Sequence, residues 1–150
     1  PLSNAKFGAA FARTCLPCQH DYALTGALIA RQLSISKLSF GYTAYQSAWP
    51  EQTPLAIEML GNILKANNIE LVLPVQDLDS RDQARQYLRA ENLSEEALEQ
   101  KCIKQVTNIA LNDTELLAHL SHWSTELTAA MGRNVAITVL ESRTLAEFAR

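Results

Sequence analysis

The stretch "EQTPLAIEMLGNILKANNIELVLPV", residues 51–75, contains the pattern on which the predicted fold depends. Thr53 is a favourable N-cap residue and Pro54 suits the first helical position, so the pattern predicts a helix over 54–67. The apolar run over 69–75 then predicts a buried strand. A helix that leads directly into a buried strand is typical of α/β proteins with a parallel sheet.

The rest of the chain continues this alternation. The predicted helices cover 21–33, about 80–90, a segment from Ser94 that carries Cys102, 112–131 and 143–150, and the other predicted strands cover 37–41 and 134–140. Strands that are separated by helices pair in parallel through right-handed crossovers. The sequence therefore predicts one α/β domain over 1–150, in which helices flank a small parallel sheet.

Composition and charge limit the classes of protein to consider. Hydrophobic residues make up 47% of the 150 residues and charged residues 19%, which is typical of a globular domain. The net charge of −3 gives no overall attraction to nucleic acid. No apolar run reaches the roughly 18 residues of a membrane span. No secretory leader opens the chain, so we expect a cytoplasmic protein without a membrane partner.

The cysteines are the first candidate site. Cys15 and Cys18 form a C-x-x-C pair inside the segment 13–24, and the third cysteine, Cys102, lies far along the chain. Without a secretory signal, thiols or metal ligands fit this set better than a disulfide framework. A c-type haem site would need histidine directly after the second cysteine, but Gln19 occupies that position.

Four interpretations of the cysteines stay open. The pair would suit a thioredoxin-like redox site at the start of a helix, although no clear strand leads into it. A structural zinc ion would need a fourth ligand, for which His20, His119 and His122 are the candidates. An iron–sulfur cluster would take thiolates from Cys15, Cys18 and Cys102, which would leave one iron of a four-iron cubane without a protein ligand. Alternatively, Cys102 is simply a small buried apolar residue.

The loop over 41–52 is the second candidate site. It follows a predicted strand, and in open α/β sheets ligands bind beyond the carboxyl ends of strands. Tyr42, Tyr45 and Trp49 offer stacking faces, and Gln46, Glu51 and Gln52 offer polar edges for a base. We therefore expect Gly41, Tyr42 and Gln46 to contact a ligand. In the ordinary alternative, the aromatic residues only pack down as a cover over the core.

Three arginines recur at every fourth position of the helix predicted over 80–90. Arg81, Arg85 and Arg89 would form one basic stripe that could contact RNA phosphates. Acidic residues surround them, however, so a solvated face with salt bridges explains the pattern better.

The order of these elements resembles a known family. "CLPC", a helix, a strand, "GYTAYQ", "EQTPLAIEML", "IELVLPVQDLDS" and "LSEEALEQKC" follow one another as in the second half of a PP-loop ATP pyrophosphatase, of the adenine nucleotide alpha-hydrolase-like superfamily. The resemblance covers roughly residues 12–110. This superfamily includes tRNA thiolation enzymes and 7-cyano-7-deazaguanine synthases. In the thiolation enzymes that carry a cluster, a C-x-x-C precedes a helix and a third cysteine follows after a long interval, as Cys102 does here.

The resemblance implies a fold and a function. The chain would be the C-terminal half of an incomplete HUP or PP-loop-type domain, with a helix–strand–helix extension at its end. Its activity would be ATP- and magnesium-dependent adenylation of a base carbonyl oxygen, followed by replacement of that oxygen with sulfur. Cys15, Cys18 and Cys102 would hold a 4Fe–4S cluster. The alternatives are a zinc-containing enzyme similar to 7-cyano-7-deazaguanine synthase, or a non-catalytic binding module.

The chain also departs from the family pattern. It lacks the Ser-Gly-Gly-x-Asp-Ser loop that grips ATP phosphates, since none of its five glycines are adjacent. Gln46 stands about where the family has an aspartate, and an amide cannot act as a general base. Only fourteen residues precede Cys15, and the helices predicted over 21–33 and 54–67 are apolar on more than one face. We therefore expect an N-terminal half or a partner chain to supply the ATP loop and further strands, or a homodimer to cover the sheet edge. The substrate would be tRNA or a small nucleobase.

Overall fold

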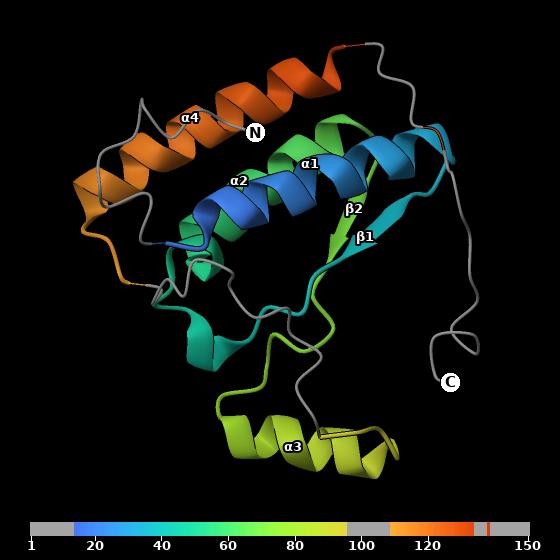
Figure 1. The fold of residues 1–150 in the computed structure, drawn as a ribbon, viewed down its shortest axis with the longest axis vertical. Helices are drawn as coiled ribbons and strands as arrows, with labels where there is room; N and C mark the ends of the chain where they lie inside the picture. Colours follow the sequence, from blue (N-terminus) through green and yellow to red (C-terminus); the bar gives the residue numbers. More distant parts are fainter. Residues whose placement is uncertain (1–13, 96–108, 134–137, 139–150) are drawn as a thin grey trace.

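A computed structural model of the chain describes residues 14–95, 109–133 and 138. Its elements in chain order are α1 (Leu16–Gln32), β1 (Lys37–Ser39), the short 3-10 turns η3 (Ala44–Gln46) and η4 (Pro50–Gln52), α2 (Pro54–Ala66), β2 (Glu70–Val72), α3 (Arg81–Ala90) and α4 (Asp113–Met131). Helices α1 and α2 pack against the two strands, α4 packs across both of these helices, and α3 lies apart from them (Figure 1). The predicted α/β class is confirmed.

The two strands form a parallel sheet, as the sequence predicts. Lys37 pairs with Glu70, and the next partners along the strands are Leu38 and Leu71. These two leucines turn to the same face of the sheet, where they approach glycines of α1 and α2 respectively. Both strands are shorter than the predicted ranges, because the apolar runs continue beyond the last paired residues.

Local capping signals predict several helix ends well. The side chain of Thr53 accepts a hydrogen bond from the backbone N–H of Ala56, with 3.3 Å between the two atoms, at the start of α2. Asn112 and Glu115 form a complete capping box at the start of α4. At the start of α3, the side chain of Ser80 accepts a hydrogen bond from the backbone N–H of Gln83. These side chains satisfy N–H groups that have no partner inside the helix.

The start of α1 differs from the prediction. The helix begins at Leu16, five residues before the predicted start, so Cys15 is its N-cap residue and Cys18 lies in its first turn. Pro17 is tolerated there because the first N–H groups of a helix have no intrahelical acceptor in any case. The first helical bond joins the N–H of Gln19 to the carbonyl of Cys15, at 3.0 Å. The cysteine pair therefore lies at the N-cap and in the first turn of α1, whereas the sequence predicts a helix that begins after the pair.

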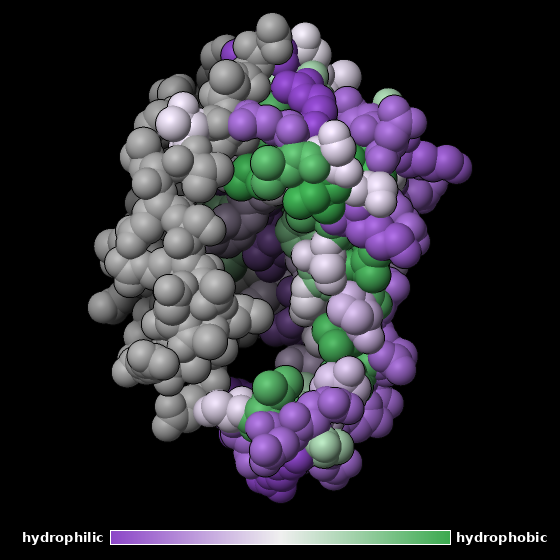
Figure 2. All heavy atoms as spheres, turned by 90° about the vertical axis from the view of Figure 1, so that its right-hand side faces the viewer, coloured by the Kyte–Doolittle hydropathy of each residue, from purple (hydrophilic) through white to green (hydrophobic). Residues whose placement is uncertain are grey.

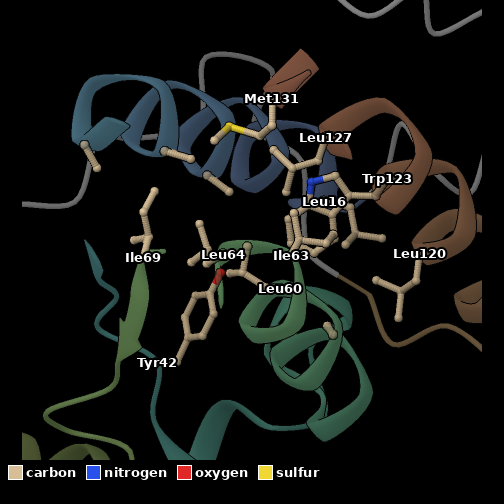
Figure 3. Packing of buried hydrophobic residues seen from close by; sticks show 14 of the residues in the cluster. Leu16, Tyr42, Leu60, Ile63, Leu64, Ile69, Leu120, Trp123, Leu127 and Met131 are labelled. Atoms are coloured by element: carbon tan, nitrogen blue, oxygen red, sulfur yellow. The ribbon is translucent and has the colours of Figure 1, made fainter. Parts of the chain in front are cut away.

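One hydrophobic core lies between the three packed helices and the sheet (Figure 3). Its buried apolar residues are Leu16, Ala23, Ala27 and Ala30 of α1, Ala56, Leu60, Ile63 and Leu64 of α2, Leu116, Leu120, Trp123, Leu127 and Met131 of α4, and Tyr42 and Ile69. Helices α1 and α4 also pack against each other. At the far end of this contact the guanidinium of Arg31 donates hydrogen bonds to the carbonyls of Met131 and Arg133, so the C-terminal ends of the two helices lie together.

α3 has a different environment. None of its residues is buried, and Figure 2 shows mostly hydrophilic side chains in this part of the molecule, at the bottom of the view. The predicted helix with Cys102, most of the strand predicted over 134–140 and the helix predicted over 143–150 lie outside the described residues. Within the described ranges, no helix is long and apolar enough to cross a membrane.

Candidate functional site

The loops that follow the two strands meet at one edge of the sheet. Because β1 and β2 are parallel, their carboxyl ends lie at the same edge, which is where ligands bind in open α/β sheets. The backbone N–H of Tyr45, after β1, donates to the carbonyl of Leu78, after β2, at 3.3 Å. The edge is therefore built from two loops that contact each other.

The cysteine pair lies at the start of α1. Cys18 is exposed and Cys15 is partly exposed, and the two are not joined to each other by a disulfide. Both lie at a helix N-terminus, where unpaired N–H groups favour negative charge. The third predicted ligand, Cys102, lies outside the described residues. Among the residues that the structure describes, no group of three histidine, cysteine or acidic side chains is arranged to hold a metal ion.

A hydrogen bond joins the first candidate site to the second. The hydroxyl of Tyr42, in the loop after β1, donates to the side-chain oxygen of Gln19 at 3.3 Å. Gln19 directly follows Cys18 in the first turns of α1. The loop and the C-x-x-C pair, which the sequence analysis treats separately, are therefore neighbours.

Tyr42 itself is a buried residue. It is only 4% exposed, and the centroid of its ring lies 5.2 Å from the centroid of the Phe40 ring. In Figure 3 its side chain points into the core. Burial raises the pKa of its hydroxyl well above the usual range, and the negative charge of Glu51 raises it further. Tyr42 thus joins the loop to α1, and its ring offers no open face for stacking.

Two glutamines hold the loop in shape. The side-chain oxygen of Gln52 accepts from the backbone N–H of Thr43 at 3.1 Å. The side-chain oxygen of Gln46 accepts from the hydroxyl of Thr43 at 3.1 Å and from the amide of Gln52 at 3.2 Å. This oxygen is therefore already engaged within the loop. By contrast, Gly41 is exposed, and the space beside its Cα is open.

The remaining aromatic residues of the loop face outward. Tyr45 is 39% exposed and Trp49 is 40% exposed, although both are large and amphipathic. Their backbones are held by the contact to Leu78 and by a 2.9 Å bond from the N–H of Trp49 to the carbonyl of Gln46. An ordered loop that exposes two aromatic rings can stack against a planar ligand.

Glu51 is a loop residue whose environment the sequence does not reveal. The pattern suggested a polar edge for a base, but the structure buries this carboxylate to 2% exposure beside Pro50 and Gln52. The burial of Glu51 depends on the η4 turn, and the only sequence feature that indicates this turn is Pro50 at its start.

The three histidines lie on or near the contact of α1 with α4. His20 is 3% exposed and meets Trp123 edge-on, with 5.9 Å between ring centroids. Burial lowers its pKa, the charge of Asp21 opposes that shift, and His122 adds to it. The Nε2 atom of His122 lies 4.0 Å from a carboxylate oxygen of Glu126. Burial also lowers the pKa of His119. His20 is thus part of the helix–helix contact.

The arginine stripe of α3 has acidic partners, as its neighbours predict. A nitrogen of Arg85 lies 4.0 Å from a carboxylate oxygen of Asp82, and Arg89 donates two hydrogen bonds to Glu95. The solvated, salt-bridged face is confirmed for these two arginines.

Two shallow apolar hollows lie between α2 and α4. Their volumes are about 360 and 310 Å³, and Leu55, Met59 and Ser124 border both. Gly41, Tyr42 and Gln46 line neither of them. The hollows are thus separate from the predicted ligand residues.

Comparisons with protein-family models, with curated proteins and with solved structures find no match for this chain. Any proposal of function therefore depends on the chemistry of its own residues.

Proposed function

We propose that this chain is a PP-loop-type α/β protein that takes part in modifying a nucleobase with sulfur. Cys15, Cys18 and Cys102 would be the ligands of an iron–sulfur cluster. The observation that carries the proposal is the 3.3 Å hydrogen bond between Tyr42 and Gln19. Because of this bond, the thiol pair lies beside the loop that we expect to bind a base, at one edge of the molecule.

The loop supplies the contacts for a base. Tyr45 and Trp49 expose aromatic rings, and a base stacked on such a ring gains about 1–3 kcal/mol. The hydrogen bonds among Thr43, Gln46 and Gln52 fix the backbone that carries these rings. A preformed loop binds a planar ligand at a lower ordering cost than a flexible one.

The thiols supply the contacts for a metal centre. Two cysteines in one helical turn are soft ligands that suit iron–sulfur clusters and zinc. With Cys102 as the third ligand, a four-iron cluster would keep one iron that is open to an incoming sulfur atom. Activation of the base would need ATP and magnesium on a nucleotide loop, which we assign to an N-terminal half or a partner chain. The described part of this chain would bind and orient the base, which would be part of a tRNA or a small molecule.

Metal analysis after purification without oxygen tests this proposal. We expect a brown protein that contains iron and acid-labile sulfide, and we expect Cys18→Ser and Cys102→Ser each to lose most of both. Thr25→Ala is the matched control, because Thr25 is an exposed residue of the same helix and has no ligand role. A colourless protein with one zinc per chain would favour the second candidate, an enzyme similar to 7-cyano-7-deazaguanine synthase. Protein with neither metal would refute both and would leave a binding module.

The two tryptophans allow an independent test of base binding. Trp49 is exposed and Trp123 is 4% exposed, so only Trp49 can be quenched by a stacked ligand. We expect unmodified tRNA or a nucleobase to quench the fluorescence, and Trp49→Phe to abolish that change while Trp123 still reports the fold. Quenching that persists in Trp49→Phe would show that the ligand binds elsewhere.

A further inference from the structure

The first turn of α1 brings two thiols close together. Cys15 is the N-cap residue and Cys18 follows three positions later, with Leu16 and Pro17 between them. Side chains at positions i and i+3 of a helix are neighbours, with about 5–6 Å between Cβ atoms. A disulfide needs about 3.5–4.5 Å between the same atoms. By these ranges, the two Cβ atoms would have to approach each other by roughly 0.5–2.5 Å to reach a disulfide geometry.

The end of the helix can supply that movement. Cys15 has φ −84° and ψ −3°, whereas N-cap residues usually have an extended backbone. Its carbonyl accepts the 3.0 Å bond from Gln19 that begins the helix. Pro17 donates no hydrogen bond at all. A rotation at Cys15 therefore leaves the hydrogen bonds farther along α1 intact.

We propose that Cys15 and Cys18 close a reversible disulfide by exchange with a low-molecular-weight disulfide such as oxidised glutathione. Cys18, the exposed thiol, attacks one sulfur of that disulfide as the thiolate and expels the first small thiolate. Cys15 then attacks the Cys18 sulfur of the mixed disulfide and expels the second. The cysteine pair loses two electrons and two protons, and the small disulfide gains them as two thiols. A bond at an exposed helix end that needs such a rotation is readily reduced, so the exchange reverses with excess thiol.

This disulfide also regulates the metal site, an inference that rests on the proposed function. Metal binding and disulfide formation use the same two sulfur atoms, and a disulfide sulfur is no longer a thiolate ligand. Oxidation therefore prevents loading of the site, and reduction restores it. Neither cysteine belongs to the buried apolar cluster, so closing the disulfide consumes no side chain of the core, and Leu16 between them should stay buried in the oxidised chain.

Peptide mass spectrometry tests the disulfide directly. Trypsin cuts after Arg13 and Arg31, so Cys15 and Cys18 fall in one peptide, 14–31, and Cys102 falls in another. The full chain carrying Cys102→Ser is freed of metal, incubated with excess oxidised glutathione and blocked with an alkylating agent. We expect peptide 14–31 to lose two hydrogen masses and to escape alkylation, and excess dithiothreitol to reverse both changes.

Single substitutions identify the role of each thiol. In Cys15→Ser the mixed disulfide of Cys18 with glutathione has no second thiol to resolve it, so it should accumulate. Serine is a favourable N-cap residue, so this variant should stay folded, which circular dichroism checks. The inference is overturned if peptide 14–31 stays fully reduced in the parent, or if Cys15→Ser accumulates no glutathione adduct.

A measurement of metal uptake distinguishes a failure of this inference from a failure of the proposed function. Reduced and oxidised protein are each incubated with zinc or with iron and sulfide, and the bound metal is measured. Uptake by the reduced form alone supports the regulation. Equal uptake by both forms overturns it. A disulfide that forms in a protein that binds metal in neither state refutes the proposed metal site and leaves the exchange reaction itself supported.

Discussion

Tyr42 allows the connection between the loop and α1 to be tested by a single substitution. Tyr42→Phe removes the hydroxyl that donates to Gln19 and leaves the buried ring in place. A typical hydrogen bond of this kind contributes about 0.5–1.5 kcal/mol to the free energy of unfolding. This bond is long, at 3.3 Å, and water can reach the partly exposed side chain of Gln19 when the hydroxyl is gone. We therefore expect a loss of about 0.5 kcal/mol at pH 8, at the lower end of that range.

The same substitution should have the opposite effect in alkali. Burial, and then the charge of Glu51, raise the pKa of Tyr42 above that of a tyrosine in the unfolded chain, which is about 10. Above pH 10 the unfolded chain therefore binds fewer protons than the folded chain, and stability falls as the pH rises. At pH 11 this loss is about 1.4 kcal/mol in the wild type. The phenylalanine variant has no such loss, so it should be the more stable protein at pH 11 by about 1 kcal/mol.

Urea unfolding of both proteins at pH 8 and pH 11 measures this reversal. Tyr22→Phe is the matched control, because Tyr22 is 54% exposed on the surface of α1. Tyrosinate absorbance gives a second measurement, in which Tyr42 should titrate only when the folded chain opens. If the stability difference between wild type and Tyr42→Phe is the same at both pH values, Tyr42 is not held neutral in the folded chain and the reasoning fails.

Three further substitutions test the packing, the capping and the surface of the fold by urea unfolding. Leu127→Ala should cost about 2–5 kcal/mol, because Leu127 is fully buried in the contact of α4 with the core, and a loss below 1 kcal/mol would contradict that packing. Thr53→Ala should cost about 1 kcal/mol through the lost bond to Ala56, whereas Thr53→Ser should retain most of it; equal losses would exclude a capping role. Arg89→Ala should leave the stability unchanged within error, because its pair with Glu95 is solvent-exposed, and a clear loss would show that α3 is held by this contact.

The sequence predicts the elements that local chemistry specifies. The caps at Thr53, Ser80 and Asn112 each act within three residues of their own position, so the starts of α2, α3 and α4 can be read directly. The parallel pairing also follows, because a helix must return the chain from β1 to β2. The start of α1 is missed because its N-cap, Cys15, makes no side-chain cap and gives no signal of that kind.

Properties that depend on distant parts of the chain are harder to predict. The apolar run over 69–75 predicts a buried strand, but only Ile69 is buried, and only Glu70, Leu71 and Val72 pair with β1. Each strand of this two-stranded sheet has a single neighbouring strand, so the rest of the run stays partly or fully exposed. The burial of Glu51 and the bonds between Gln46 and Gln52 arise only when the loop folds back on itself. His20 reads as a candidate ligand, yet the face of α1 that it shares with the core alanines turns it toward Trp123.

The union of the two candidate sites follows from the direction of the chain. α1 leads into β1 through a short connection, so the chain reverses and the N-terminus of α1 returns to the edge where β1 ends. A C-x-x-C at the start of that helix and a loop at the end of that strand must therefore be neighbours, whatever the rest of the sheet contains. Tyr42 makes the contact specific, because its hydroxyl reaches the residue next to Cys18. A change that displaces Tyr42 should therefore disturb the thiol pair and the aromatic loop together, whereas a change on α3 should disturb neither.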